Sequence, residues 1–397
     1  MCSWAIHALL NYLQPSSPLL NSSEIEIRLV SLRSPLFRLH FLGNRQITTM
    51  SVGCRSRLPL HHLATSVVLA LLLATSCICG SPTPSAGSPT ALSANVAPQL
   101  MSKTLLSKHY ISCILSDVDG TLLSSAENKH QLSKRTFTTI AAVIDSGYAF
   151  FPCTGRSRHS MALAAPEILN LFGGDIENVP GVYQQGLQVY GPTGQLIYEK
   201  FLDYSKIAEV TRFCDDEKVA VIAYAGERIF CRTRCNQTDK IGEYSEPPPE
   251  IHSDGLEKLG DIGIKVHKLI ILADEIELER VRPLLQAYMG QSVSLTKAVP
   301  GMLEVLPPGS SKGEGVSVLL KHIGVSPENV MAFGDGENDV EMFSLVQLGV
   351  AVENAKTILK NNAQALTLSN DDDGVAEVLE LLLESQAEVR ARILAAL

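Results

Sequence analysis

Short apolar runs and segments of helical period alternate along the chain from about residue 110 onward. Residues 111–115 form a mostly apolar run that is typical of a strand buried on both faces. In residues 133–145, apolar side chains recur at the i, i+3, i+4 and i+7 positions of a helix. A glycine typical of a helix C-cap follows, and residues 148–151 return to strand character. This alternation predicts a parallel sheet with crossover helices.

The same alternation returns near the end of the chain. Strands are expected at 302–306, 330–333, 348–352 and 365–368, with helices at 312–323 and 338–345 and a closing helix through residues 375–382. We therefore expect one parallel-sheet domain that is built from residues 106–186 and 298–386, with a C-terminal tail at 387–397.

The middle of the chain has a different pattern. Two strand-like runs flank the turn sequence at 191–194, and two more flank residues 226–227, so each pair predicts a hairpin. Helical segments follow both pairs. Residues 187–297 are therefore expected to form an inserted α+β unit.

The first hundred residues differ from the rest in composition. Their only acidic residues are Glu24 and Glu26, and an uncharged run at 63–80 follows a basic stretch and precedes a Pro/Ser/Gly-rich one. This order is typical of a targeting leader, which predicts that residues 1–105 direct the protein to a plastid or the secretory pathway. The run is also just long enough to be a membrane anchor. A mispredicted gene start, with translation from Met50 or Met101, would instead leave a cytoplasmic protein.

Bulk composition limits the class of protein. With 45% hydrophobic and 19% charged residues, the 397-residue chain can bury a sizeable core. A net charge of −9 argues against a nucleic-acid partner, because such binding requires a basic surface. Nine cysteines, an odd number that falls partly in apolar runs, suit buried reduced thiols better than a disulfide framework.

Two carboxylates follow the first predicted strand, in residues 117–121 (DVDGT). Side chains at the carboxyl end of a parallel strand project into the crevice where α/β sheets bind ligands. There, one carboxylate can attack phosphorus while its neighbour manages the proton of the leaving oxygen. The same residues also suit a simple turn or a helix N-cap.

Two further segments could bind a phosphate. Residues 154–156 (TGR) follow the strand at 148–151, where a hydroxyl and backbone N–H groups can cradle an anion, although an ordinary helix N-cap would look the same. Lys312 begins a predicted helix, where the helix dipole disfavours a cation. In the crevice its charge would stabilise a phosphoryl group and the nucleophile, whereas elsewhere it would be a solvated surface lysine.

An acidic segment, residues 334–339 (GDGEND), follows the strand at 330–333. Its carboxylates could join Asp117 in an all-oxygen site of the kind that suits Mg²⁺. A plain acidic turn or a partial calcium loop is the alternative, but the full calcium-loop pattern is absent. All four segments fall at or just beyond the carboxyl ends of predicted strands, where one crevice can gather them.

Together these motifs resemble those of the haloacid-dehalogenase superfamily, specifically its Cof-type subfamily (IIB). The resemblance covers residues 110–383 and rests on residues 117–122, 154–156, Lys312 and 334–339. Residues 180–191 (PGVYQQGLQVYG) are most similar to plastid-located Cof-type domains of plants and algae. The resemblance implies an α/β fold, a Rossmann-like parallel-sheet core with an inserted α+β cap of the C2B type over residues 187–297.

The resemblance also implies a role for each candidate site residue. Asp117 would be the nucleophile and Asp119 the general acid/base. Mg²⁺ would be held by the Asp117 carboxylate, the Asp119 backbone carbonyl and Asp335. The phosphoryl group would be bound by Thr154, Gly155, Lys312 and Asn338, and Asp339 would support Lys312 or the metal shell. One departure concerns residues 184–186 (QQG), where the family usually has Asn-Gly. That segment lies near the leaving group, so it bears on substrate choice.

The expected function is therefore Mg²⁺-dependent hydrolysis of a small phosphorylated metabolite through an aspartyl-phosphate intermediate. A sugar phosphate or a flavin- or pyridoxal-related phosphate is the expected substrate, and the protein is expected to be a monomer or homodimer. Two alternatives are a phosphomutase, because phosphomannomutases share this cap class, and a catalytically idle binding module. A membrane partner is expected only if the segment at 63–80 remains as an anchor.

Overall fold

The computed structural model describes residues 26–29, 36–43, 46–53, 99–124, 131–244 and 246–396. The chain divides into two units, residues 1–93 and 94–397. In the first unit, β1 (Glu26–Leu29), β2 (Leu36–Gly43) and β3 (Gln46–Gly53) form an antiparallel sheet that the leader prediction did not include. The uncharged run at 63–80 lies outside the described residues. No helix in the described ranges is long and apolar enough to cross a membrane.

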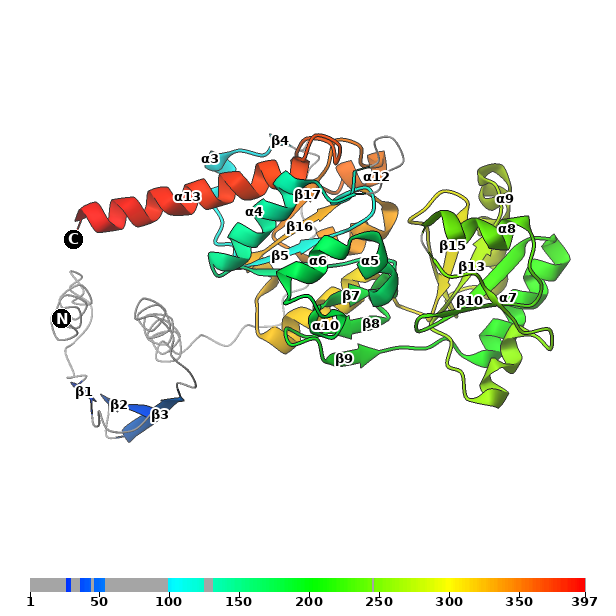
Figure 1. The fold of residues 1–397 in the computed structure, drawn as a ribbon, viewed down its shortest axis with the longest axis horizontal. Coiled ribbons are helices and arrows are strands. Elements are labelled where there is room, and N and C mark those ends of the chain that lie inside the picture. Colours follow the sequence, from blue (N-terminus) through cyan, green and yellow to red (C-terminus); the bar gives the residue numbers. More distant parts are fainter. Residues whose placement is uncertain are drawn as a thin grey trace. The chain divides into compact units, whose positions relative to one another are not determined.

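A six-stranded sheet organises the second unit, and every neighbouring pair of its strands is parallel (Figure 1). In spatial order the strands are β4 (Gln99–Leu100), β18 (Ala365–Leu366), β17 (Leu348–Ala351), β16 (Val330–Gly334), β5 (Cys113–Ser116) and β6 (Ala149–Pro152). The predicted parallel sheet is therefore confirmed. Strand β4 and the short helix α3 (Lys103–Leu106) belong to this unit, although the leader was expected to extend to residue 105.

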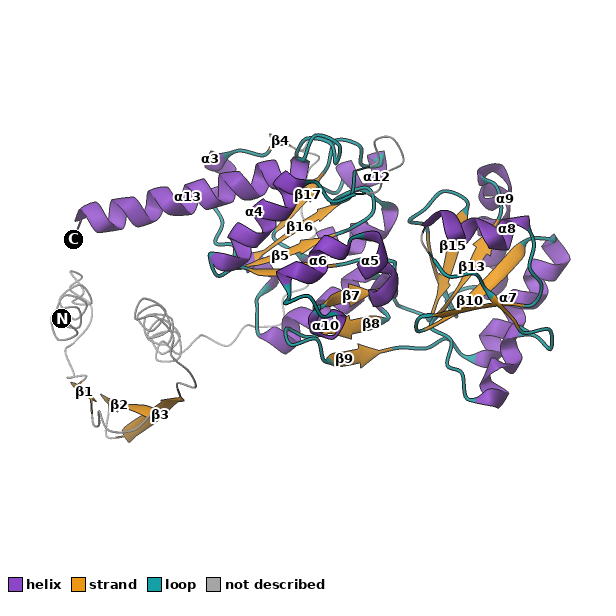
Figure 2. Cartoon of the chain, viewed as in Figure 1, coloured by secondary structure: helices purple, strands orange, loops and turns teal. Residues whose placement is uncertain are grey.

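Helices connect and cover these strands, as the alternation predicted (Figure 2). They are α4 (Lys134–Asp145), α5 (Arg158–Ala164), α6 (Pro166–Leu171), α10 (Lys312–Ile323), α11 (Val340–Leu345), α12 (Thr357–Lys360) and α13 (Gly374–Ala396). Helix α4 begins where the Ser133 side chain accepts a hydrogen bond from the Thr136 N–H (3.0 Å), a standard N-cap.

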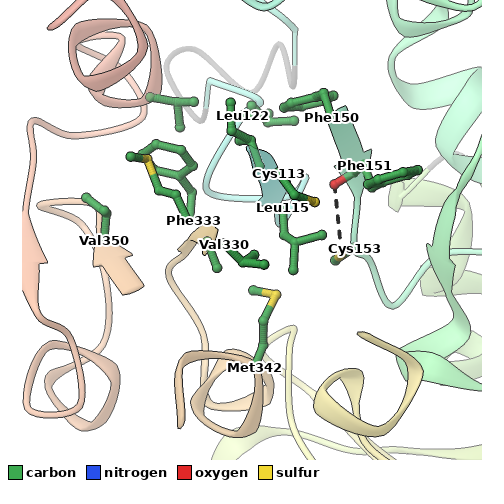
Figure 3. Close-up of a cluster of buried hydrophobic side chains, with 14 of the residues drawn as sticks. Cys113, Leu115, Leu122, Phe150, Phe151, Cys153, Val330, Phe333, Met342 and Val350 are labelled. Atoms are coloured by element: carbon green, nitrogen blue, oxygen red, sulfur yellow. Dashed lines mark hydrogen bonds between the residues drawn. The ribbon is translucent and has the colours of Figure 1, made fainter. Parts of the chain in front are cut away.

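Side chains from neighbouring strands form the core of this sheet domain. Leu115 of β5, Phe151 of β6 and Phe333 of β16 gather in one buried cluster, and Met342 of α11 packs on it (Figure 3). The five described cysteines are all free thiols. Burial raises the pKa of Cys113 to about 12, so its thiol stays protonated and acts as an apolar group, as the sequence predicted.

A second six-stranded sheet is built mainly from the inserted residues. Its order is β12 (Glu250–Ile251), β11 (Arg228–Cys231), β10 (Ala220–Ala225), β13 (Lys268–Leu272), β15 (Met302–Leu306) and β14 (Ser294–Thr296). The longer helices of this region are α7 (Tyr204–Glu217) and α9 (Glu275–Met289), and a short helix, α8 (Asn236–Asp239), follows β11. The expected α+β character of this region is confirmed.

Three strands belong to other sheets than the sequence pattern suggested. Residues 302–306 were expected in the parallel sheet, but as β15 they pair antiparallel with β13 and β14. The hairpin β8 (Gln188–Tyr190) and β9 (Leu196–Glu199) was expected in the inserted unit, but it pairs with β7 (Gly181–Tyr183) and contacts α10. An apolar run predicts a strand without specifying its partner, which explains both errors. The domain limits at 187 and 297 remain a prediction.

Candidate active site

Lys312 joins two carboxylates beneath the carboxyl end of the parallel sheet. Asp117 follows β5 directly, and its N–H donates to the Phe333 carbonyl (3.0 Å), which continues the pairing of β5 with β16. Lys312 is the first residue of α10, and its ammonium group donates to Asp117 Oδ1 and to Asp339 Oδ1 (2.7 Å). The Lys312 side chain is wholly buried, so its charge acts on these two carboxylates at short range.

Three carboxylates lie close enough together to share a cation. One oxygen of each of Asp117, Asp335 and Asp339 lies within 4.8 Å of the others. The Thr121 hydroxyl bridges the first two, 3.4 Å from Asp117 Oδ2 and 3.3 Å from Asp335 Oδ1. Gly120 makes this approach possible, since its φ is +77° and a Cβ there would lie 2.6 Å from Asp335 Oδ2.

The electrostatics of this cluster favour an added positive charge. The pKa of Asp117 lies well above its usual range, because burial outweighs the effect of Lys312 and the neighbouring carboxylates add to the burial effect. Burial and Asp339 also raise the pKa of Asp335 to about 6. Three carboxylates and a single ammonium group carry excess negative charge, and the donors are all hard oxygens. These residues therefore fit a divalent cation such as Mg²⁺.

Asp339 is less available to a metal than the other two carboxylates. Its Oδ1 accepts from Lys312, while its Oδ2 accepts from the backbone N–H groups of Asp335 (3.1 Å) and Gly336 (2.9 Å). These bonds fix the acidic turn after β16 and hold Lys312 in place. This geometry agrees with the expectation that Asp339 supports Lys312.

Asp119 is held by an arginine that the sequence did not pair with it. Arg156 donates from Nε and Nη2 to the two Asp119 oxygens, at 2.7 and 2.8 Å. Arg156 also donates to the Ser160 hydroxyl (3.1 Å) and to the Tyr244 carbonyl. The Asp119 side chain keeps 31% of its surface exposed, so the expected general acid/base lines the cleft while both its oxygens are bonded to Arg156.

The candidate phosphate-binding residues fall into two groups. Thr154, Gly155 and Asn338 line the same cleft as Asp117, Asp119 and Asp335. Lys312 does not line the cleft but lies behind Asp117. The structure thus brings all eight predicted residues together, with Lys312 and Asp339 underneath the others.

The sequence did not identify a buried polar network on the other side of the cleft. Gln185 accepts a hydrogen bond from Asn338 Nδ2 (3.1 Å) and donates to Glu304 Oε1 (2.7 Å). The other Glu304 oxygen accepts from Lys268 (2.6 Å), which also donates to the Gly155 carbonyl (2.8 Å). Charged residues inside the wholly buried strands β13 (KLIIL) and β15 (MLEVL) were the available signal.

Comparison with known proteins gives consistent matches over this part of the chain. Residues 114–379 match the family described as haloacid dehalogenase-like hydrolase. The chain is 35% identical over 280 residues to a protein of Arabidopsis thaliana named chloroplastic endoribonuclease YBEY, and the match covers 69% of this chain but only 47% of that protein. The chain thus spans about half the length of this relative.

Two further matches extend over nearly the whole of the compared proteins. The chain is 22% identical over 308 residues to a 5-amino-6-(5-phospho-D-ribitylamino)uracil phosphatase of Bacillus subtilis, which covers 70% of this chain and 99% of that protein. It is also similar in structure to a HAD/COF-like hydrolase from Plasmodium vivax. That similarity has a TM-score of 0.64 and 27% identity, and it covers 71% of this chain and 99% of the other.

Proposed function

Because the chain belongs to the haloacid dehalogenase-like hydrolase family, we propose that it is a Mg²⁺-dependent phosphatase that hydrolyses a small phosphorylated metabolite. The observation that carries this proposal is the contact of Asp117 with buried Lys312, next to Asp335 and at the edge of an open cleft. A carboxylate in that position can act as a nucleophile toward a phosphate that enters the cleft.

The reaction takes two steps in this proposal. First, a carboxylate oxygen of Asp117 attacks phosphorus, the bond from phosphorus to the alcohol oxygen breaks, and that oxygen takes a proton from Asp119. Second, water attacks phosphorus of the aspartyl phosphate while Asp119 takes the water proton, and the bond from phosphorus to the Asp117 oxygen breaks, which releases phosphate and restores the Asp117 carboxylate. The ion pair with Arg156 corresponds to the ionised Asp119 of the second step.

The other site residues bind and orient the reacting groups. Asp117, Asp335 and the Asp119 backbone carbonyl would hold Mg²⁺, which supplies positive charge against the phosphate dianion. Thr154, Gly155 and Asn338 would receive the phosphoryl oxygens from the cleft wall. Lys312 lies behind Asp117 and would orient the nucleophile through its hydrogen bond to the Asp117 carboxylate.

Substrate class and location are further parts of the proposal. We propose a sugar phosphate or a flavin- or pyridoxal-related phosphate as the substrate, which is supported by the Bacillus subtilis relative named above, a phosphatase of a ribitylaminouracil phosphate. A plastid location is supported by the composition of the first hundred residues and by the chloroplastic Arabidopsis relative.

The test is release of inorganic phosphate by the full chain from p-nitrophenyl phosphate and from a panel of phosphorylated metabolites. We expect phosphate release with Mg²⁺ present. A hexose 1-phosphate separates hydrolysis from mutase chemistry, because a hexose 6-phosphate product without free phosphate would mean a mutase. Absence of any reaction across the panel would contradict both.

A further inference from the structure

The part of the cleft that would receive the alcohol portion of a substrate is lined by residues that the proposed chemistry does not use. They come from the second sheet and the loop before β12 and include Tyr224, Tyr244, Glu246, Lys268, Ile270 and Glu304. The charges of these residues, and their hydrogen-bonding atoms that have no partner among the described residues, determine which alcohol portions of a substrate can bind in this part of the cleft. The following inference rests on the proposed phosphatase function and specifies its substrate class.

Both cations in the cleft wall are already neutralised. Arg156 forms its two-bonded ion pair with Asp119. Lys268 pairs with Glu304, and the two side chains are only 3% and 6% exposed. Among the described lining residues, no arginine or lysine is therefore left to receive a second anionic group of a substrate.

Carboxylates outnumber cations in the same wall. Five carboxyl groups, those of Asp117, Asp119, Asp335, Glu246 and Glu304, face only two cations, Arg156 and Lys268. Lys312 lies behind the wall and is itself bonded to two carboxylates, Asp117 and Asp339, so it adds no free positive charge to the cleft. A phosphoryl group must approach this wall in any case, so a second anion on the alcohol would add repulsion without gaining a partner.

Two polar groups remain available to a ligand. Glu246 Oε1 accepts from the Ser160 hydroxyl (2.7 Å), whereas no hydrogen bond to Oε2 is seen within the described residues. The Tyr224 side chain is 4% exposed and lines the cleft, and its hydroxyl makes no hydrogen bond to any described residue. Burial raises the pKa of Glu246. In its ionised form a carboxylate oxygen only accepts hydrogen bonds, so a ligand atom bonded to it is then a donor, such as a hydroxyl or an ammonium group.

We infer that the cleft selects phosphate monoesters whose alcohol portion carries hydrogen-bond donors and no negative charge, and that Glu246 enforces this selection. Polyhydroxylated and amine-bearing alcohols satisfy the rule. Bisphosphates, nucleoside diphosphates and phosphorylated sugar acids violate it. Glu246 is thus a specificity-determining residue that acts on the alcohol and not on the phosphorus.

The test uses three aryl phosphates that differ at one remote position: 4-hydroxymethyl-, 4-aminomethyl- and 4-carboxymethylphenyl phosphate. The assay uses the full chain with Mg²⁺ at a mildly alkaline pH, which favours the ionised form of Glu246. Under these conditions kcat/KM for the carboxymethyl ester should lie about tenfold or more below the values for the other two esters. The corresponding benzylphosphonates, which cannot be hydrolysed, should show the same order of Kd values by calorimetry.

Matched variants assign the effect to one side chain. Glu246→Gln should reduce the discrimination between the neutral and anionic esters to about threefold or less. Glu243→Gln removes the same charge at a nearby exposed position outside the cleft, in the 3-10 helix Lys240–Tyr244, and it should leave the discrimination unchanged. Equal kcat/KM and Kd values across the wild-type series would overturn the inference, as would unchanged discrimination in Glu246→Gln. No phosphate release from any ester would overturn the proposed function and this inference together.

Discussion

Arg156 binds both carboxylate oxygens of Asp119, at 2.7 and 2.8 Å, and so connects the second sequence motif to the first. The planar guanidinium group matches a carboxylate in two places, which restricts the orientation of Asp119 as well as its charge. Its remaining bonds to Ser160 and to the Tyr244 carbonyl place Arg156 itself. We therefore regard Arg156 as a positioning residue for the general acid/base.

Replacing Arg156 with lysine should lower kcat while the protein remains folded. Lysine keeps the positive charge but loses the two-bonded geometry, so Asp119 would no longer be held toward the leaving oxygen. Misplacing a general acid/base should cost about 10- to 100-fold in kcat. Steady-state kinetics with p-nitrophenyl phosphate measures this, and the exposed Arg212→Lys provides the control. An unchanged kcat in Arg156→Lys would remove the positioning role.

Asp117→Asn should abolish turnover without unfolding the protein. An amide cannot form the phosphoryl bond, so hydrolysis should fall by about a thousandfold or more. The variant keeps the size of the side chain and leaves Asp339 as a partner for Lys312. Phosphate release and circular dichroism should be measured together, with the exposed Asp145→Asn as the control. Full activity in Asp117→Asn would eliminate this residue as the nucleophile.

Much of this site could be predicted because its residues occupy short local motifs. Asp117 and Asp335 each follow an apolar strand, and parallel strands bring their carboxyl ends to one edge of the sheet. Lys312 needed the family resemblance, since a lysine at a helix start is locally disfavoured. Its burial depends on carboxylates 195 and 27 residues away along the chain, and such distances leave no local pattern.

The parts that could not be predicted depend on pairing across long separations. Arg156 lies in a recognised motif, but its partner Asp119 is 37 residues away, and no periodicity connects them. Glu304 was read only as part of an apolar strand, whereas its partner Gln185 lies 119 residues away in the turn between β7 and β8. Its other partner, Lys268, lies 36 residues away in the neighbouring strand β13. The same limit placed β15 in the wrong sheet, because side-chain alternation defines a strand's faces and not its neighbours.

Lys312→Met should destabilise the fold strongly. Without the ammonium group, Asp117 and Asp339 would both be buried without a compensating charge. Breaking a buried ion pair in this way costs about 3–5 kcal/mol in the free energy of unfolding. Urea denaturation measures the loss. Lys321→Met, in the last turn of the same helix but exposed, should cost far less. Equal losses in the two variants would contradict the arrangement around Lys312.

Removal of metal should silence the enzyme. EDTA should stop phosphate release and added Mg²⁺ should restore it, because the carboxylate cluster alone would repel a phosphate dianion. Asp335→Asn removes one proposed ligand and should raise the Kd for Mg²⁺, measured by calorimetry, by about tenfold or more. The exposed Asp254→Asn should bind Mg²⁺ normally. Turnover in metal-free buffer would refute the proposed site.

Gln185 should act on the reaction through Asn338. Its backbone has a φ of +60°, which is uncommon for a residue other than glycine, and its side chain is wholly buried between Asn338 and Glu304. An unusual backbone conformation that is fixed by two side-chain bonds indicates that the Gln185 amide is held in one orientation against Asn338, which lines the cleft. Gln185→Leu should therefore free Asn338 and lower kcat/KM by about tenfold, mainly through KM.

A double-mutant cycle distinguishes this positioning role from a general loss of packing. If Gln185 acts by holding Asn338, then Gln185→Leu should have little further effect on kcat/KM once Asn338→Ala has been introduced. A role in packing alone would give additive effects on kcat/KM. Gln291→Leu, at an exposed position, controls for replacement of a glutamine in general and should leave kcat/KM unchanged. Additive effects on kcat/KM would therefore show that Gln185 does not act through phosphate binding and has only a structural role between the two sheets.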